Sequence, residues 1–444
     1  MLPILNQSFW RDEAFSALLS SHSPLEIIRL TSKDFSPPLY YIVLHYWVSI
    51  FGNNEIVFRS LSFVFHIFIA IVAFLIIKRI TKSIWVQILT TFVIFANPFL
   101  LQYAFEARQY SLLCLLCLCV TYFLIDRKYF IASIFLGLGI YTHNFAVFTF
   151  LASFIWCLLQ RVNLLKNLLK LSIIPLISLS FWGSIMLTQW QHVAREFWIT
   201  RVTTAIFTHS LEVYTSGDLI FDLQPLLYLL SLGIIFLASS YWINHKKDKD
   251  NYISIFITLS LLPIFITYLI SVYFAPIYHE RYLIASLPLI IIAIAYSLWK
   301  LYNTIEHIRI PLIFIIGMYM IVLVQSSEKI VNISTKPAIN WGIEQVISLG
   351  ESGDILISDP INFLEAKYYL SKSSKNIKLF AYLPKGEPPF YIGKILFKVE
   401  DIIHVIPKDK TVWKINSDGG FKQIAKKIIK NKINLNRQES IQIK

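Results

Sequence analysis

The stretch IVFRSLSFVFHIFIAIVAFLII, residues 56–77, decides the fold class of this chain. It is long and apolar enough to cross a bilayer as one helix. Nine further apolar segments follow, at residues 84–103, 110–125, 129–142, 144–160, 168–188, 223–243, 252–273, 282–299 and 310–325. The sequence therefore predicts a mainly α, polytopic transmembrane helical bundle of about ten or eleven spans. The short pair 129–142 and 144–160 is compatible with two helices or with one bent, re-entrant feature.

The composition of the whole chain supports this class. Of its 444 residues, 56% are hydrophobic and only 15% are charged, and the mean hydropathy is +0.60. That balance is too apolar for an ordinary soluble domain. The formal net charge of +13 indicates contact with lipid headgroups, not with nucleic acid. The aromatic segment 39–51 is too short to span and is predicted to be an interfacial helix.

The charged residues of the predicted loops differ between the two sides of the membrane. One set of loops is rich in lysine, as at Lys78, Lys128 and Lys246, and the positive-inside rule makes this side cytoplasmic. The opposite loops carry Asp12 and Glu13, and their basic residues other than Lys33 are Arg11, Arg29, Arg59, Arg108, Arg195, Arg201 and Arg281. Because guanidinium groups hold phosphate or carboxylate in a planar fork, we expect the chemistry on this outer side.

The character of the chain changes after residue 326. We predict a transmembrane catalytic domain at 1–326, with a first outer loop at 1–55, and a small extracytoplasmic α/β domain at 327–444. The second region reads as a helix at 339–349, a strand in DILIS (354–358), a helix in NFLEAKYYL (362–370), and strands in IKLFAY (377–382) and TVWKI (411–415). The basic tail from Phe421 is predicted to be an amphipathic helix, lying on the membrane or in solvent.

Three motifs cluster before the first span. WRDEAFSALL (10–19) places Asp12 and Glu13 before a helix-like stretch, where acids also stabilise a helix N-terminus. KDFSPPLYYIVLHYW (33–47) places Asp34 before a rigid Pro-Pro pair that opens an aromatic helix. FGNNEIVFRSLS (51–62) brings Arg59 to the start of the first span. The pair of acids is therefore a candidate catalytic group or a helix start.

Three later motifs complete an ordered set: QYAFEARQYSLL (102–113), GLGIYTHNFAVF (137–148) and HERYLIASLPLI (279–290). Together with DEAFS and DILISDPINFLEAKYYL, this set resembles the polytopic GT-C glycosyltransferases. The sequence is most similar to glycosyltransferase family 39 and its bacterial relatives, which include protein O-mannosyltransferases and aminoarabinose–lipid A transferases. The resemblance covers nearly the whole chain.

The resemblance implies a function and a set of site residues. Such enzymes move a sugar from a polyprenyl-phosphate donor to an acceptor outside the cytoplasm, in one inverting displacement. It implies that Asp12 is the general base that takes the acceptor proton. Glu13 and Glu106 are further catalytic candidates, Glu106 as the residue that orients Arg108 or the acceptor, or as a structural ion pair. The residues expected to bind the donor phosphate are Arg281, Arg108 and Arg59.

Further candidates for substrate binding are Asp34, Tyr40, His143, His279 and Glu280. His143 is either a metal or substrate contact or a hydrogen-bonded packing histidine. His279 and Glu280 could bind a divalent metal ion with Glu13 or Asp34, so such an ion stays open as a cofactor. Many relatives have His directly before the Pro-Pro pair, where this chain has Ser36, and this departure puts a family-style metal site in doubt.

Two other function classes compete with the transferase. A transporter or flippase of lipid-linked sugars would carry polar sites near the midplane, often in repeated halves. Here the charges gather at one face without a repeat, which favours the enzyme. The third reading, an inactive accessory protein, is opposed by the intact Asp12–Glu13 pair.

Several features remain open at this stage. The sugar is not specified, and the acceptor is a lipid, a glycan or a protein. We expect a multi-pass protein of a bacterial plasma membrane with its active site and C-terminal domain outside, although an endoplasmic reticulum protein would have the same topology. The relatives usually carry a span before the acidic pair. Either a short N-terminal tail crosses here or a first helix is missing from the gene model.

Overall fold

The structure is a computed structural model that describes residues 3–160, 163–195, 198–218, 222–244, 251–334 and 336–426. The chain divides into two compact units. The helical unit comprises Met1–Lys336 together with Pro389–Leu396. The sheet unit comprises Pro337–Pro388 and Phe397–Lys444.

The helical unit begins with four short helices in the region predicted to be the first outer loop. They are α1 Pro3–Asn6, α2 Arg11–Ser20, α3 Pro24–Thr31 and α4 Leu39–Phe51. Local chemistry sets their starts: the Ser23 hydroxyl accepts the Glu26 N–H at the start of α3, and α4 begins directly after the Pro-Pro pair. The aromatic segment 39–51 is thus a separate helix, as predicted.

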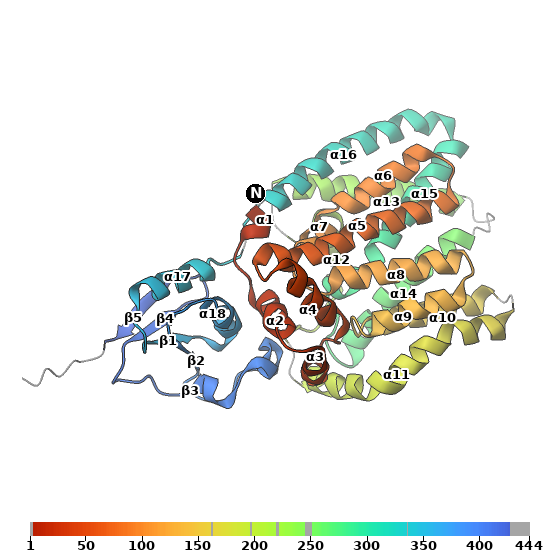
Figure 1. Ribbon diagram of the computed structural model, residues 1–444. Coiled ribbons are helices and arrows are strands. Elements are labelled where there is room, and N and C mark those ends of the chain that lie inside the picture. Colours follow the sequence, from red (N-terminus) through yellow and green to blue (C-terminus); the bar gives the residue numbers. More distant parts are fainter. Residues whose placement is uncertain are drawn as a thin grey trace, which may run out of the picture. The chain divides into compact units, whose positions relative to one another are not determined.

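The remaining helices of this unit form the bundle labelled in Figure 1. They are α5 Glu55–Ile80, α6 Ile84–Ala96, α7 Pro98–Ala104, α8 Tyr110–Ile125, α9 Tyr129–Ile140, α10 Ala146–Gln160, α11 Leu164–Arg195, α12 Ile206–Ser216, α13 Gln224–Asn244, α14 Asn251–Tyr273, α15 Ser286–Thr304 and α16 Arg309–Asn332. A short 3₁₀ helix, η1 Glu280–Leu283, precedes α15. Every apolar segment predicted from the sequence is helical, so the mainly α polytopic class is confirmed.

The number of full-length spans is smaller than ten. In the described ranges, six helices are long and apolar enough to cross a membrane, or seven if the bent pair α6 and α7 is one span. That pair bends by 58° where Asn97 caps α7 and Pro98 interrupts the backbone ladder. The difference lies in α8, α9 and α10, which are apolar but each shorter than a full span. The predicted pair at 129–160 forms two separate helices.

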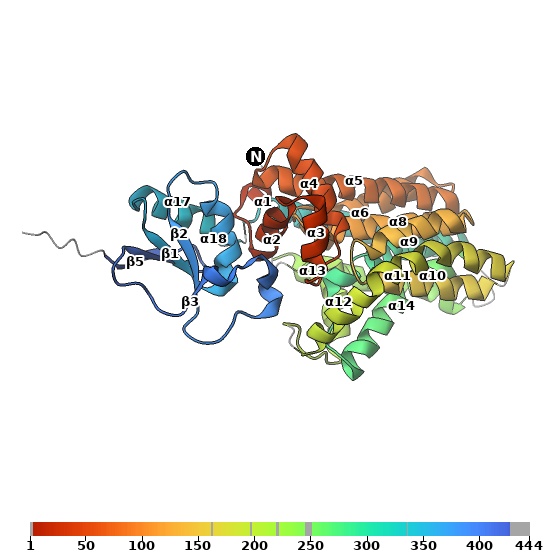
Figure 2. The same ribbon diagram turned by 60° about the horizontal axis from the view of Figure 1, so that its bottom comes forward.

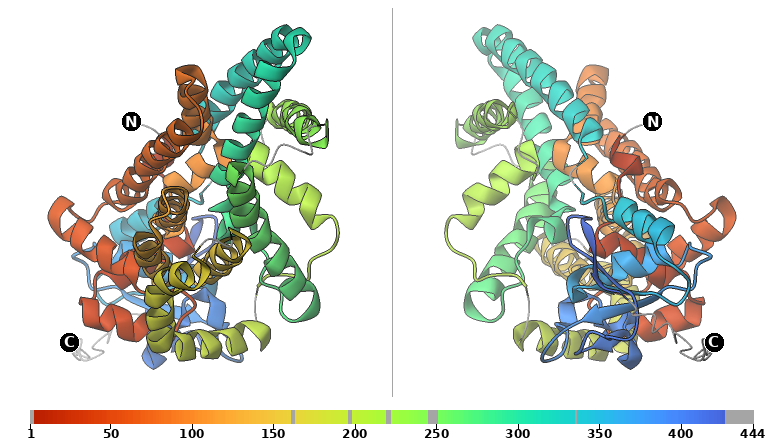
Figure 3. Two further views of the ribbon diagram at one scale, coloured as in Figure 1. Left: turned by 90° about the vertical axis from the view of Figure 1, so that its right-hand side faces the viewer. Right: turned by 90° about the vertical axis from the view of Figure 1, so that its left-hand side faces the viewer.

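The bundle is held by close helix packing. In Figure 2, α8, α9, α10 and α11 lie side by side, and α9 makes its most extensive contact with α11. Gly137 permits this approach, because a Cβ there would lie 2.6 Å from the Ile174 side chain. The helices α13 and α16, green and teal in Figure 3, also contact one another.

The sheet unit has the predicted α/β organisation. Its elements are α17 Ile339–Leu349, β1 Ile355–Ser358, α18 Phe363–Leu370, β2 Lys378–Tyr382, β3 Ile402–Ile403, β4 Val412–Ile415 and β5 Phe421–Ala425. The strand order is β3-β2-β1-β4-β5, parallel except for the antiparallel pair β4–β5. The central strand β1 is fully buried, which explains its uninterrupted apolar run.

One local prediction for this unit was wrong. The sequence from Phe421 was expected to start an amphipathic helix, but Phe421–Ala425 is strand β5. Pairing with β4 outweighs the helical pattern, because β5 bonds backbone groups at the edge of β4 that would otherwise face solvent. The basic remainder of the tail, residues 427–444, lies outside the described residues.

Candidate active site

The adjacent acids Asp12 and Glu13 lie in the first turn of α2, as the helix-start interpretation required. Successive residues of a helix point about 100° apart, so the two side chains enter different surroundings. Glu13 is completely buried, whereas the Asp12 side chain is 15% exposed. The structure therefore separates the pair into two different roles.

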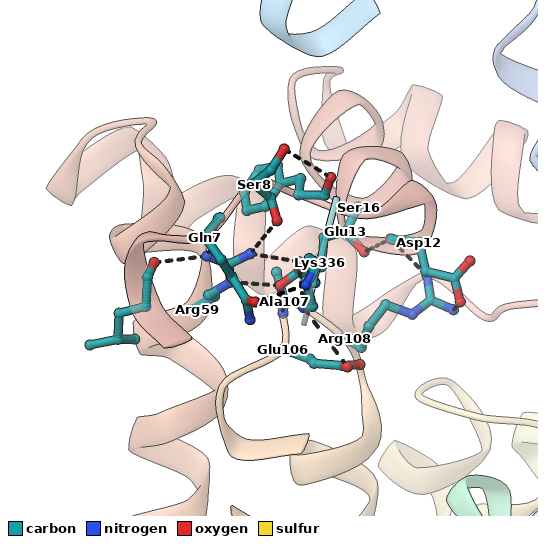
Figure 4. Close-up of polar contacts among 12 residues, drawn as sticks. Gln7, Ser8, Asp12, Glu13, Ser16, Arg59, Glu106, Ala107, Arg108 and Lys336 are labelled. Carbon is teal, nitrogen blue, oxygen red and sulfur yellow. Dashed lines mark hydrogen bonds and ion pairs between the residues drawn. The ribbon is translucent and has the colours of Figure 1, made fainter. Parts of the chain in front are cut away.

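Glu13 is enclosed by donors (Figure 4). Arg59 of α5 donates from Nε to Oε1 at 2.8 Å and from Nη2 to Oε2 at 2.7 Å, and the Ala107 N–H donates to Oε1 at 3.2 Å. The Lys336 Nζ donates to Oε2 at 2.8 Å. Burial by itself would raise the pKa of Glu13, but Arg59 and Lys336 outweigh it and hold the pKa at about 2. Glu13 has no free position from which to accept a substrate proton.

The donors of Arg59 are likewise occupied by hydrogen bonds within the protein. Beyond Glu13, its guanidinium donates to the carbonyl oxygens of Leu5, Gln7 and Ser8 at 2.8, 2.8 and 3.2 Å. Its side chain is completely buried and does not line the cavity described below. The sequence-based assignment of Arg59 to the donor phosphate is therefore not supported, because these contacts occupy its donors and tie the N-terminal segment to α5.

Asp12 instead faces two arginines. Its Oδ2 lies 3.9 Å from Arg108 Nη2 and 3.8 Å from Arg281 Nη1, while Oδ1 is 3.3 Å from Arg11 Nε. Burial acts to raise the pKa of Asp12, but Arg108 and Arg281 prevail and lower it below its ordinary value. The carboxylate is thus ionised at neutral pH. Its contacts with Arg108 and Arg281 are longer than direct hydrogen bonds.

A cavity of about 230 Å³ opens at Asp12. It is lined by side chains from the first 36 residues, from residues 143–148 at the start of α10, from α11 and from η1. Its polar lining residues are Arg11, Asp12, Asp34, Ser36, Arg108, Gln109, His143, Asn144, Gln189 and Arg281. The predicted residues Asp12, Asp34, Arg108, His143 and Arg281, far apart in sequence, therefore meet in one cavity.

The two arginines beside Asp12 keep donor capacity. Each is 8% exposed, and the Nε of each is buried without a hydrogen-bond partner. Arg281 is surrounded by the rings of Trp10, Tyr110, Trp198 and Tyr282, with centroids 4.8–6.0 Å from its Cζ. Cation–π contacts hold the guanidinium without using its N–H groups. Two buried, incompletely satisfied guanidinium groups at a cavity favour binding of an anion.

The short helix η1 fixes Arg281 through its neighbours. The His279 Nδ1 accepts the Arg281 N–H at 3.4 Å, and Glu280 Oε1 accepts the Ser210 hydroxyl at 2.7 Å. Burial, and then Arg281, lower the pKa of His279 to about 3, so the ring is neutral. His279 and Glu280, predicted to bind substrate, are therefore contacts of the η1 region and are not among the described residues that line the cavity. Tyr40 is also absent from the lining, and its hydroxyl pairs with Ser62 at 3.1 Å.

Asp34 and His143 are two further polar residues that line the cavity. Burial raises the pKa of Asp34 to about 6, against lowering contributions from the Phe35 N–H and Arg108. Burial also lowers the pKa of His143 to about 3, and the two cavity arginines add to this. The neutral His143 ring accepts the Phe145 N–H at Nδ1, which leaves its other nitrogen protonated as a donor. The neutral His143 ring can donate to a hydroxyl group without adding a charge, whereas Asp34, with a pKa still below neutral pH, is mainly an ionised acceptor.

Glu106 is not among the described residues that line the cavity, and its nearest cation is Lys336. Its Oε1 is 3.9 Å from Lys336 Nζ, and its Oε2 has no hydrogen-bond partner. Burial raises the pKa of Glu106 to about 7, and Lys336 lowers it less than burial raises it. This is the structural ion pair considered as the alternative, although a loose one. Figure 4 shows Glu106 on the loop that also carries Arg108.

Replacing Glu106 by Gln is expected to change the pH dependence of stability. Because the pKa of Glu106 is raised from 4.5 to about 7, folding takes up a proton here, and stability falls as pH rises through that window. The Gln variant lacks this titration. Its unfolding temperature relative to wild type should therefore rise between about pH 5 and about pH 8. Thermal unfolding in detergent measures this, with the exposed Glu306→Gln as control. A pH-independent difference would contradict the assignment.

Three features of the site were not found from the sequence. Lys336 follows the last span as an ordinary loop lysine, and only the fold brings it to Glu13. Gln189 and Asn144 hydrogen-bond across the cavity wall at 2.9 Å, in segments without a recognisable motif. Tyr391, Ile392 and Gly393 line the cavity from a segment far along the chain. In the segment that follows α11, Trp198 reaches the cavity, while Glu196 lies outside the described residues.

The cavity at Asp12 is not the largest one. A second cavity of about 590 Å³ lies among α6, α12, α13, α15 and α16, and no Asp, Glu, His, Lys or Arg is among its described lining residues. It offers apolar surface but no acid–base group. The smaller cavity is therefore the candidate active site.

The predicted metal group is not assembled. In the described ranges, no three His, Cys, Asp or Glu side chains are grouped to hold an ion. Glu13, one of its proposed members, is fully engaged by Arg59 and Lys336.

No protein-family model matches this chain, and no curated protein sequence matches it. Two solved structures do: ArnT from Cupriavidus metallidurans in the apo state and the same protein bound to undecaprenyl phosphate. Each is 12% identical, with a TM-score of 0.61 over 93% of this chain and 90% of the other. An Archaeoglobus fulgidus oligosaccharyltransferase in complex with Zn and sulfate is similar at a TM-score of 0.45 and 12% identity, covering 83% of this chain and 61% of the other. The ArnT likeness shows that this multi-pass membrane chain has the GT-C fold.

Proposed function

We propose that this protein is a glycosyltransferase that moves a sugar from a polyprenyl-phosphate donor to a hydroxyl acceptor, with inversion and with Asp12 as general base. The observation that carries the proposal is the ionised Asp12 carboxylate beside two buried arginines that keep unpartnered donor atoms at one cavity. The fold shared with ArnT, a protein solved in complex with undecaprenyl phosphate, supports the donor class.

The roles follow from the chemistry of the transfer. The acceptor hydroxyl is a weak nucleophile, so a carboxylate must take its proton while the glycosidic bond breaks. Free Asp12 is a weak base because the arginines lower its pKa. When the donor phosphate binds Arg108 and Arg281, its negative charge offsets theirs, and Asp12 becomes more basic. The donor thus activates the base.

The arginines stabilise the leaving group. Polyprenyl phosphate departs as an anion, so it needs cations and no general acid. Arg108 Nη2 and Arg281 Nη1 lie 3.9 and 3.8 Å from Asp12 Oδ2, longer than direct hydrogen bonds, so these N–H groups remain for phosphate oxygens. Asp34, His143, Gln109 and Gln189 offer donors and acceptors to the hydroxyl groups of the sugar.

The proposal includes a location. The transferase belongs to a plasma membrane, with the cavity and the sheet unit on the extracytoplasmic side, as the loop charges predict. We propose the region from residue 327 onward as the extracytoplasmic domain. The acceptor is a lipid, a glycan or a protein that reaches this side.

Substitution of Arg281 should impair use of the donor. Arg281→Met keeps much of the side-chain volume but removes the cation, so we expect kcat/KM for the donor to fall about 10²-fold. Arg281→Lys should recover only part of it, because an ammonium group cannot replace the planar fork. Steady-state kinetics with varied donor measures both. The exposed Arg29→Met is the control, and equal activity of Arg281→Met and wild type would exclude a role in donor binding.

The function is tested by incubating the purified full-length chain in lipid nanodiscs with a panel of polyprenyl-phosphate sugars and a membrane extract as acceptor source. Mass spectrometry follows release of polyprenyl phosphate, and NMR of the product gives its anomeric configuration. Parallel reactions with EDTA or with added Mg²⁺, Mn²⁺ or Zn²⁺ decide the metal requirement. Inverted product from one donor would support the proposal. No release from any donor, with movement of a labelled lipid-linked sugar across the bilayer of closed proteoliposomes, would favour a flippase.

A further inference from the structure

The segment Pro389–Leu396 belongs to the helical unit, although the residues before and after it belong to the sheet unit. It contains two short 3₁₀ helices, η4 Phe390–Ile392 and η5 Lys394–Leu396. Gly393 joins them with a φ of 81°, a left-handed conformation that favours glycine. The segment is therefore a defined turn packed on the helices.

Phe390 anchors this turn. Its ring lies 4.8 Å from that of Phe35 in an edge-to-face contact and 4.9 Å from that of His192 in a stacked contact. Phe35 directly follows Asp34, and its carbonyl oxygen accepts a hydrogen bond from Asn144 at 3.0 Å. The helix η5 also contacts α2, which carries Asp12. Phe390 thus connects the turn to the segment after Asp34 and to α11, and η5 connects it to α2.

The next three residues face the cavity. Tyr391, Ile392 and Gly393 all line the space into which Asp12 opens. Their side chains carry no charge, and the Tyr391 hydroxyl is their only polar side-chain group. Such a wall does not suit a phosphate group, which needs cations. It suits a neutral molecule that presents an apolar ring face beside a hydroxyl group.

The geometry of inversion assigns this wall to one substrate. In a single displacement the acceptor hydroxyl attacks the face of the sugar opposite to the leaving group. On the proposed function, the leaving phosphate occupies Arg108 and Arg281. The acceptor must then reach Asp12 from another side of the cavity. Among the described lining residues, the turn at 391–393 is an uncharged wall suited to it.

We propose that Pro389–Leu396 forms part of the acceptor subsite, and that Tyr391 selects a neutral saccharide acceptor by stacking on its ring. Phe390 is a positioning residue that holds Tyr391 in place. The inference rests on the proposed function and adds the acceptor class to it. It also gives a reason why this turn packs with the helices and not with the sheet.

The test uses the full-length protein in nanodiscs with the donor found active above. Phenyl glycosides serve as neutral saccharide acceptors, and a neutral serine-containing peptide serves as the comparison. Two reactions are measured separately: acceptor-dependent transfer, and the slow release of polyprenyl phosphate when water replaces the acceptor. Tyr391→Ala and Tyr391→Phe are compared with Tyr46→Ala, whose side chain belongs to an exposed residue outside the cavity.

We expect Tyr391→Ala to raise the KM for phenyl glycosides about tenfold, and to change donor KM and release to water by a much smaller factor. Tyr391→Phe, which keeps the ring, and Tyr46→Ala should resemble wild type. Unchanged acceptor kinetics in Tyr391→Ala, an equal loss of donor use, or transfer by wild type only to the peptide would each overturn the inference alone. Absence of release by wild type from any donor would overturn the proposed function as well.

Discussion

Asp12→Asn should lower kcat/KM for sugar transfer about 10³-fold, because the amide cannot take the acceptor proton. The variant should still fold. Asn has the same shape as Asp, and the Arg108 Nη1 bond to the Asp12 carbonyl oxygen at 3.3 Å is unaffected. Transfer is measured as release of polyprenyl phosphate, and folding as the midpoint of thermal unfolding.

A control variant distinguishes the loss of the general base from the general effect of removing one negative charge. Asp222→Asn removes an acid whose side chain is 95% exposed and should leave transfer unchanged. Asp12→Glu keeps the carboxylate but displaces it by one methylene group, so it should retain more activity than Asp12→Asn. If Asp12→Asn transfers sugar at the wild-type rate, Asp12 is not the base. Asp34, the other acid of the cavity, would then be the next residue to replace.

Arg59→Met should have the largest effect on stability, a loss of about 3–5 kcal/mol, because it removes one partner of a buried ion pair. Glu13 would keep Lys336 and the Ala107 N–H but lose the bidentate guanidinium. The carbonyl oxygens of Leu5, Gln7 and Ser8 would lose a donor as well. Thermal or denaturant unfolding in detergent measures the loss.

The same helix offers a matched control. Arg79 of α5 pairs with Asp126 at 3.2 Å, but its side chain is 49% exposed. Arg79→Met should therefore cost no more than about 1 kcal/mol. The double variant Arg59→Met with Glu13→Met should be more stable than Arg59→Met alone, since the buried carboxylate that has lost its guanidinium is removed as well. A stable but inactive Arg59→Met would instead restore the sequence-based assignment of Arg59 to the donor phosphate.

Part of the site could be predicted because short motifs keep their residues at helix ends. Asp12 precedes a helical run, Asp34 precedes the Pro-Pro pair, and Arg108 and Arg281 each precede an apolar helix. Helices that cross a bilayer bring their outer ends to one level, so residues at those ends are candidates for one site. The cavity that contains Asp12, Asp34, Arg108, His143 and Arg281 agrees with that reasoning.

The sequence by itself determined the elements that depend on local composition. Apolar runs specify membrane helices, and short alternating or buried runs between turn residues specify the strands. Tertiary structure decided what each polar side chain does. Asp12 and Glu13 are neighbours in sequence, yet one faces the cavity and the other a buried guanidinium. Lys336 and Tyr391 join the site through contacts with residues hundreds of positions away. No local pattern encodes such contacts, because burial and charge pairing depend on which distant segments the fold brings together.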